Sequence, residues 1–371
     1  MNVPKLRFKE FNDEYRTYFI KDLGDVITGT TPSTSDKENY GDEFLWASPI
    51  DMGLHKYIND TKNKLSKKGF KKVRTIPKDS ILVTCIGSTI GKMGVASKEM
   101  ATNQQINTLI CNDNFENNYM YYCIGYNFPR FLNKISFQAV PIISKSEFEK
   151  LLLTCSINKQ EQTKVANFLS LLDKKIELQT KKIEDLKLFK LCIMKSIFDS
   201  SKASINLKIK DISLIEKGKQ INGDQLLEFG DYYMLNGGIN PSGYLNVYNR
   251  NENTITISEG GNSCGYVSFN KNKFWCGGHC YSVSPININN EYLYQLLKYN
   301  ERKIMDLRVG SGLPNIQKKD LENLSVKIHN NSDQENISIL LSKYDSKLDL
   351  EIIKLNILTK LKKGLMQNMF V

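Results

Sequence analysis

The chain contains one long helical sequence twice. Residues 162–198 and 334–370 align without gaps at a constant offset of 172, and the positions identical in both copies include Ser170/Ser342, Asp173/Asp345, Lys190/Lys362 and Phe198/Phe370. Neither copy contains proline, and only Gly364 interrupts a helical composition. A duplication of this length predicts two equivalent halves, and a partner or ligand that also has two halves.

The length of 371 residues exceeds one ordinary core and predicts two domains with connectors. No apolar run is long enough for a transmembrane helix, and the first residues do not resemble a signal peptide, so we expect no membrane partner. The eight cysteines are scattered singly. We therefore expect a cytoplasmic protein with free thiols.

The repeat extends beyond the helices into the segments before them. Residues 20–29 (IKDLGDVITG) resemble residues 209–218 (IKDISLIEKG), and residues 139–151 resemble residues 312–324. Both segments mix β-branched runs, glycine-rich turns and short apolar helical stretches. The predicted order is a mixed α/β domain at 1–157, a long helix at 158–198, a second mixed domain at 199–331 and a second helix at 332–371.

The two long helices carry heptad seams. The apolar seam positions include Leu172, Ile176, Ile183 and Leu186 in the first helix and Tyr344, Leu348, Leu355 and Leu358 in the second. Polar residues occupy the same missing positions of both seams, Gln179 and Lys190 and then Glu351 and Lys362, and such residues weaken a coiled coil but fix its register. A parallel or an antiparallel pair is compatible with these seams. We expect the antiparallel pair, which relates two globular parts by an approximate two-fold axis.

Each helix also carries a second apolar stripe, which includes Leu178 in the first helix and Leu350 in the second. A two-helix coiled coil buries only one stripe, so the second one predicts another buried surface, on the globular domains or on a partner protein. The ten residues predicted for coiled-coil packing and partner docking are therefore the eight seam positions above together with Leu178 and Leu350.

The formal net charge of +11 favours a polyanionic partner, nucleic acid first. The densest basic stretch is Thr61–Lys78, which holds eight Lys/Arg and no acidic residue. Such a run fits phosphate contacts through Lys67, Lys68, Lys71 and Lys72. A solvated surface loop is the alternative interpretation.

These features together resemble the specificity subunit of type I restriction–modification enzymes. The resemblance covers essentially the whole chain and depends on the order domain, helix, domain, helix. Four strings support it, namely Leu235–Tyr244 (LNGGINPSGY), Thr254–Gly261 (TITISEGG), Phe274–Tyr281 (FWCGGHCY) and Thr102–Asn107 (TNQQIN).

The resemblance implies an α+β fold with two target-recognition domains and an antiparallel coiled coil. It implies a chain without catalysis of its own, in which each domain reads one half of a split double-stranded DNA target. The helices would set the spacing of the halves and dock two methyltransferase subunits, with restriction and translocation subunits as further partners. The chain itself would bind no cofactor, whereas the complex would use S-adenosylmethionine, and ATP with magnesium for restriction.

Three motifs have functional interpretations that we consider weaker than structural ones. Asn240–Tyr244 (NPSGY) partly resembles the loop with which adenine methyltransferases hold a flipped base, but a simple turn is favoured. Gly87–Lys92 (GSTIGK) has the wrong spacing for a phosphate-binding loop of nucleotide-binding proteins. Cys276, His279 and Cys280 are ligand types for zinc, but a closed site needs a fourth ligand, and we expect no metal.

Candidate base-reading residues are short polar or basic groups beside glycine-rich turns. In the first half they are Thr28, Thr30, Thr31, Ser33, Ser48, Asp51, Ser88, Thr89, Lys92, Gln104 and Gln105. In the second half they are Lys219, Gln220, Asn236, Asn240, Ser242, Tyr244, Asn262, Ser263, His279, Arg308 and Ser311. Two other classes of function stay open at this stage, a coiled-coil interaction scaffold without DNA specificity and a self-contained zinc or thiol enzyme.

Overall fold

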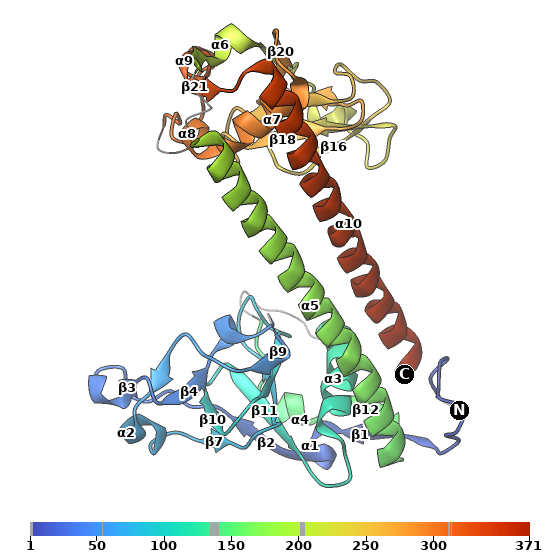
Figure 1. Ribbon diagram of the computed structural model, residues 1–371. Helices are drawn as coiled ribbons and strands as arrows, with labels where there is room; N and C mark the ends of the chain where they lie inside the picture. Colours follow the sequence, from blue (N-terminus) through green and yellow to red (C-terminus); the bar gives the residue numbers. More distant parts are fainter. Residues whose placement is uncertain (1–2, 54, 134–140, 201–204, 311, 313) are drawn as a thin grey trace. The chain divides into compact units, whose positions relative to one another are not determined.

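The computed structural model describes residues 3–53, 55–133, 141–200, 205–310, 312 and 314–371 (Figure 1). Its contacts divide the chain into two compact units, residues 1–181 with 353–371 and residues 182–352. The division falls near the middle of both long helices. Each unit therefore combines a globular part with one end of each helix.

The two long helices are α5 (Lys159–Phe198) and α10 (Asn331–Met369). Within the second unit, Lys182 bonds Glu351 at 2.9 Å and Lys190 bonds Asp345 at 2.5 Å. Residue numbers rise along α5 and fall along α10 from one pair to the next, so the helices are antiparallel there, as predicted. In the first unit Asp173 pairs with Lys362 near the opposite end of α10.

The globular part of the first unit contains three sheets. The terminal strands β1 (Tyr15–Phe19) and β12 (Leu152–Ser156) pair antiparallel. A second sheet has the order β2-β11-β8-β9-β5, and a third has the order β3-β6-β4-β10-β7. Their bounds are β2 Gly24–Thr28, β3 Tyr40–Gly41, β4 Phe44–Ala47, β5 Tyr57–Ile58, β6 Lys64–Leu65, β7 Thr75–Ile76, β8 Ile81–Thr84, β9 Met93–Ala96, β10 Met100–Thr102 and β11 Ile106–Cys111.

Helices α1, α3, α4 and α5 pack on the β2-β11-β8-β9-β5 sheet, whereas α2 packs beside β6 of the other five-stranded sheet. Figure 1 shows α3 beside α5, and the core joins Tyr119, Ile124 and Phe128 of α3 to Leu169 of α5 and Phe370 beyond α10. The bounds are α1 Ile20–Leu23, η1 Lys37–Asn39, η2 Pro49–Asp51, α2 Lys67–Phe70, α3 Asn117–Leu132 and α4 Lys145–Glu149.

The second unit repeats this plan with fewer strands. Its terminal strands β13 and β21 pair antiparallel, the larger sheet has the order β14-β20-β17-β18, and the smaller has the order β16-β15-β19. The strand bounds are β13 Ile205–Lys208, β14 Ser213–Lys217, β15 Tyr232–Leu235, β16 Gly243–Leu245, β17 Thr254–Ser258, β18 Val267–Asn270, β19 Trp275–Cys276, β20 Cys280–Pro285 and β21 Ser325–Ile328. The helices are α6 Ile209–Ile212, η3 Gly223–Gln225, α7 Asn290–Tyr299, α8 Glu301–Met305 and α9 Lys318–Asn323.

The β2-β11-β8-β9-β5 sheet, whose strands are mostly longer than those of the other five-stranded sheet of the first unit, and the β14-β20-β17-β18 sheet of the second are called the larger sheets below. They correspond strand by strand, with β2, β11, β8 and β9 matching β14, β20, β17 and β18. The edge strand β5, which pairs parallel with β9, has no counterpart beside β18 among the described residues. Helix α3 corresponds to α7 and packs in the same way, since Tyr119 contacts Phe370 in one unit and Tyr292 contacts Phe198 in the other. The predicted α+β fold with duplicated mixed domains is confirmed.

Three of the four polar seam positions, Lys190, Glu351 and Lys362, form ion pairs inside their units. Lys190 is 8% exposed and bonds Asp345, and its repeat equivalent Lys362 bonds Asp173. A buried amine tolerates the interior only with an anionic partner. These pairs explain how polar residues fit into the seam.

The seam residues are buried or half-buried, and the second apolar stripe is not. Leu172 and Ile183 are 8% and 5% exposed, whereas Leu178 and Leu350 are 58% and 59% exposed. Leu188, Ile353, Ile357 and Leu361 are exposed as well. The stripe predicted to meet another surface is thus uncovered in the chain itself.

Two further findings concern membrane-spanning helices and cysteines. No helix among the described residues is long and apolar enough to cross a membrane. All eight cysteines are unpaired, and six of them are buried.

Candidate nucleic-acid interface

One inner strand of each larger sheet, β8 in the first unit and β17 in the second, ends in the same bulged turn. In the first unit Gly91 donates its N–H to Thr84 O at 2.9 Å, and in the second Gly265 donates to Ser258 O at 2.8 Å. The φ angles of these glycines are 89° and 90°, a backbone conformation that favours glycine and defines a G1 bulge. The turn therefore projects residues 85–90 and 259–264 as equivalent loops, which contain the predicted pairs 88–89 and 262–263.

A second loop lies beside the bulged turn in both units. Cys85 donates its N–H to Gln105 O at 2.8 Å, and Glu259 donates to His279 O at 3.0 Å. Gln105 and His279 consequently occupy equivalent positions next to the bulged loops. The side chain of His279 is 63% exposed, so it is accessible to a ligand.

The loop after the first strand of each larger sheet adds a third pair. Thr30 donates its N–H to Thr102 O at 2.8 Å, and Lys219 donates to Cys276 O at 2.9 Å. Thr31, next to Thr30, bonds the side chain of Gln104. Gln220 is the second-unit residue in the position of Thr31.

A fourth pair comes from the ends of β4 and β15, which pair parallel with β10 and β19, respectively. Ser48 follows β4, and its hydroxyl donates to Asp51 Oδ2 at 2.7 Å. Asn236 follows β15, and its Oδ1 accepts the N–H of His279 at 3.1 Å. The predicted residues at these eight loops thus converge on one end of each larger sheet, inside each unit.

Other candidates lie at the margin of this loop cluster or in its scaffold. Thr28 donates to Asn107 Oδ1 at 2.7 Å, and Ser33 bonds Ser35 at 2.8 Å. Ser242 donates its N–H to Met234 O at 2.9 Å, and Tyr244 pairs with Tyr233 in the ladder of β15 and β16. Asn240 belongs to the same β15–β16 connection, so the NPSGY string forms the end of this connection and the start of β16.

Lys92, Arg308 and Ser311 were predicted from the same turn chemistry. The main-chain oxygen of Lys92 accepts the N–H of Thr84 at 2.8 Å, which places Lys92 in the bulge itself. Arg308 lies close enough to Cys264 to lower the pKa of that thiol, although burial is the larger effect and raises it. Ser311 lies outside the described residues.

The basic run is partly neutralised by acidic neighbours. Lys68 forms ion pairs with Asp36 and Glu38, and Lys72 bonds Asp36 at 3.1 Å. Both lysines belong to the surface around the short helix α2. Lys67 and Lys71 are exposed and form no ion pair among the described residues, so their charges are available to a ligand.

One basic residue of the cluster was missed by sequence reasoning. Arg74 donates to Thr28 O at 2.8 Å through its guanidinium, and its N–H donates to Thr30 Oγ1 at 3.0 Å. These contacts place an exposed guanidinium beside the predicted loop residues. Its position in the basic run Thr61–Lys78 was a signal, but no local pattern separates it from the lysines around it.

The cysteine-rich string Cys276–Cys280 is structural in its contacts. Cys276 and Cys280 are buried, and their thiols donate to main-chain oxygens at 3.6 and 3.8 Å. The exposed ring of His279 faces Glu259 at 3.9 Å. The described residues contain no group of three or more His, Cys, Asp or Glu side chains that could hold a metal ion.

A family model described as the type I restriction modification DNA specificity domain matches this chain twice, over residues 12–188 and 205–363. The chain belongs to this family. The two matched ranges correspond to the two halves of the duplication, and each includes one bulged-turn loop cluster.

Curated specificity subunits align with parts of the chain. A putative type I specificity subunit of Mycoplasma pneumoniae is 34% identical over 148 residues, covering 38% of this chain and 39% of that protein. The MjaIX specificity subunit of Methanocaldococcus jannaschii is 27% identical over 303 residues, covering 79% of this chain and 66% of that protein. The chain thus spans between two fifths and two thirds of the length of these two specificity subunits.

Solved structures share the fold. The crystal structure of a type I restriction–modification S subunit from M. genitalium matches with a TM-score of 0.71 at 21% identity, covering 100% of this chain and 99% of that one. A chain from a structure on complex assembly and conformational transition of the type I system matches with a TM-score of 0.56 at 12% identity, covering 96% and 98%. At these identities the likeness concerns the fold.

Proposed function

We propose that this chain is the DNA specificity subunit of a type I restriction–modification complex. Each unit would read one half of a split double-stranded target through its bulged-turn loop cluster. The observation that carries the proposal is the duplication of this cluster with different side chains, such as Ser88 and Thr89 against Asn262 and Ser263. Equivalent loops with unlike polar groups suit an asymmetric two-part sequence.

The proposed DNA contacts are of two kinds. The loop residues carry hydroxyl, amide, imidazole and ammonium groups that match base edges. Lys67, Lys71 and Arg74 present positive charge on the first unit, which suits phosphate contacts that position the duplex. The net charge of +11 supports the same substrate.

The exposed second stripe of α5 and α10 is the proposed docking surface for two methyltransferase subunits. Exposed leucine and isoleucine in this number on paired helices mark a protein interface. The helices would also act as a spacer between the two reading loops. Restriction and translocation subunits are further proposed partners of the complex.

The chain itself is proposed to be non-catalytic and to bind no cofactor or metal. In the complex, S-adenosylmethionine would serve methylation, and ATP with magnesium would serve restriction, on the other subunits. The proposed location is the cytoplasm, where unpaired cysteines are stable and the DNA substrate is accessible.

The proposal is tested by mapping adenine methylation in cells that carry the partner subunits, with and without this chain. We expect a methylated motif in two parts that depends on the chain. A purified-protein experiment addresses the alternative scaffold role. Phosphate neutralisation makes DNA affinity fall steeply with salt, whereas a scaffold without DNA specificity would show no such binding.

A further inference from the structure

In the first unit a lysine from the edge strand fills a polar site between α3 and α5. Lys56 immediately precedes β5, and its ammonium donates to Tyr122 Oη at 3.1 Å and to Ser170 Oγ at 2.9 Å. The hydroxyl of Tyr122 in turn donates to Asp173 Oδ2 at 2.5 Å. The main-chain oxygen of Lys56 accepts the N–H of Val95 at 2.8 Å, so strand pairing delivers this side chain into the site.

The second unit contains the same receptor groups. Ser342 and Asp345 are the repeat equivalents of Ser170 and Asp173, and Gln295 of α7 takes the place of Tyr122. The Gln295 amide N–H donates to Asp345 Oδ2 at 2.6 Å, as the Tyr122 hydroxyl does to Asp173 in the first unit.

The second unit lacks the ammonium that completes this arrangement. Gln295 is fully buried, and its amide oxygen has no hydrogen-bond partner among the described residues. In the first unit the corresponding oxygen, that of Tyr122, accepts a hydrogen bond from Lys56. A buried amide oxygen without a partner is unfavourable and indicates a missing donor.

The main-chain partner is missing as well. In the described part of the second unit, β18 is the terminal strand of its sheet. Val267 N–H and O point away from β17, since they bond Glu301 at 2.9 Å and Lys298 at 3.0 Å. Phe269 lies two residues further along and therefore presents its N–H on the same edge, at the position of Val95 and beyond the part that Glu301 and Lys298 cover.

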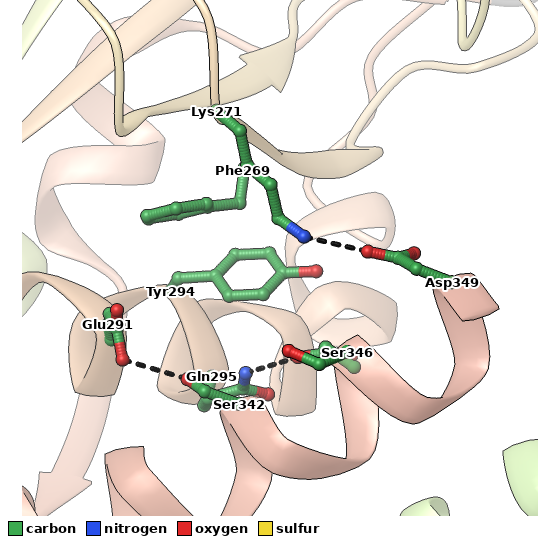
Figure 2. A pocket seen from close by; sticks show the side chains of 9 residues that line it. Phe269, Lys271, Glu291, Tyr294, Gln295, Ser342, Ser346 and Asp349 are labelled. Carbon is green, nitrogen blue, oxygen red and sulfur yellow. Dashed lines mark hydrogen bonds and ion pairs between the residues drawn. The ribbon is translucent and has the colours of Figure 1, made fainter.

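A pocket opens at this place. Its volume is about 410 Å³, and its lining includes Phe269, Tyr294, Gln295, Ser342, Asp345 and Asp349 (Figure 2). Glu291 adds a third carboxylate to the lining, where its Oε2 accepts from Ser342 Oγ at 2.8 Å.

The pocket has more carboxylates than its own cations satisfy. Lys190 bonds Asp345 from within the helix pair, and Lys271 bonds Asp349 at 2.7 Å with both side chains more than half exposed. Glu291 has no ion-pair partner among the described residues. The charge of the pocket therefore favours a cationic side chain.

We propose that an extended segment of a partner protein adds to the open edge of β18, parallel to it, and places a lysine in this pocket. The lysine ammonium would donate to Ser342 Oγ, near the carboxylates of Asp345 and Glu291. The segment's main chain would accept the N–H of Phe269. This is strand addition with side-chain specificity, and the chain's own β5 is the template for it.

The probe for this proposal is a capped, fluorescently labelled peptide with the sequence of residues 53–60, GLHKYIND, which contains the template lysine. Anisotropy titrations with the full chain should give saturable binding in the millimolar range or tighter. The same peptide with Met in place of the lysine should bind about tenfold more weakly, because it loses charged hydrogen bonds.

Two matched variants locate the site. Ser342→Ala should weaken peptide binding about fivefold to tenfold, since it removes one acceptor. Ser170→Ala makes the same change at the equivalent position of the first unit, which is already filled by Lys56, and should leave peptide binding unchanged. Circular dichroism of both variants verifies that they are folded.

Several outcomes would overturn the proposal. They are no saturable binding up to about 2 mM peptide, equal binding of the lysine and methionine peptides, or equal effects of Ser342→Ala and Ser170→Ala. Equal affinity for n-butylamine and the peptide would overturn the strand-addition part, because the pocket would then recognise the amine alone. The experiment contains no DNA, so its outcome is independent of the proposed DNA specificity.

Discussion

Replacing Lys190 by Met should destabilise the second unit strongly. The Lys190 side chain is 8% exposed, and its Nζ lies 2.5 Å from Oδ1 of Asp345, whose side chain is 27% exposed. Removing the cation leaves a largely covered carboxylate with Gln295 as its remaining hydrogen-bond partner among the described residues. Breaking a buried pair on one side costs about 3 kcal/mol of the free energy of unfolding, at the lower end of the usual range because Asp345 retains some solvent contact.

The matched control is Lys271→Met in the same unit. Lys271 pairs with Asp349 at 2.7 Å, but the side chains are 60% and 55% exposed. An exposed ion pair contributes about 0.5 kcal/mol, so this variant should unfold almost like the parent protein. Comparing the two lysines separates burial from the mere presence of an ion pair.

Urea unfolding followed by tryptophan fluorescence is a suitable assay. The chain has two tryptophans, Trp46 in the first unit and Trp275 in the second, so a Trp46→Phe background reports the second unit alone. A double variant, Lys190→Met with Asp345→Leu, should recover only part of the loss, because it removes the unpaired carboxylate but leaves the buried Gln295 amide without its acceptor. Equal unfolding free energies for the two single lysine variants would refute the reasoning.

Three further predictions concern the first unit, the partner surface and DNA. Burial lowers the pKa of Lys56 to about 8, so between pH 8 and the unfolded value near 10.4 the unfolded chain binds more protons than the folded one. The unfolding free energy should therefore rise with pH in this window, and it should rise less in the Lys56→Met variant. Equal slopes for the two proteins in urea titrations at several pH values would contradict this. Leu350→Asp should reduce co-purification with methyltransferase subunits while the melting temperature changes little, since the side chain is 59% exposed; a large drop in melting temperature with intact co-purification would argue against docking there. Reversing the charges of Lys67 and Lys71 should weaken binding to all DNA sequences and reduce the salt slope by about 2, and unchanged affinity in a salt series would remove α2 from the DNA interface.

Much of the architecture was predictable because the heptad pattern and the composition of each half can be recognised within single stretches of the sequence. The heptad seam identified both helices and their polar positions, and the composition of each half predicted mixed domains. The partners of the polar seam positions were not predictable. Lys190 and Asp345 stand far apart in the chain, and only the direction of helix pairing decides that they meet.

The candidate site shows the same limit more clearly. Glycines such as Gly91 and Gly265 predicted turns. The equivalence of the loops 85–90 and 259–264 follows from their hydrogen bonds, and no short sequence motif indicates these bonds. The lysines around α2 looked like one basic patch in the sequence. Acidic residues some thirty positions earlier pair with Lys68 and Lys72, and a linear charge count cannot show this.

The central claim is that each duplicated loop cluster reads one half of the target. The most direct measurement is single-molecule mapping of methylated adenines in cells that carry the partner subunits and either the natural chain or an Asn262→Ala, Ser263→Ala variant. The account predicts a methylated motif in two parts for the natural chain. With the variant, the bases of one half of the motif should change and those of the other half should stay the same. An identical motif for both chains, or the absence of any motif that depends on the chain, would contradict it.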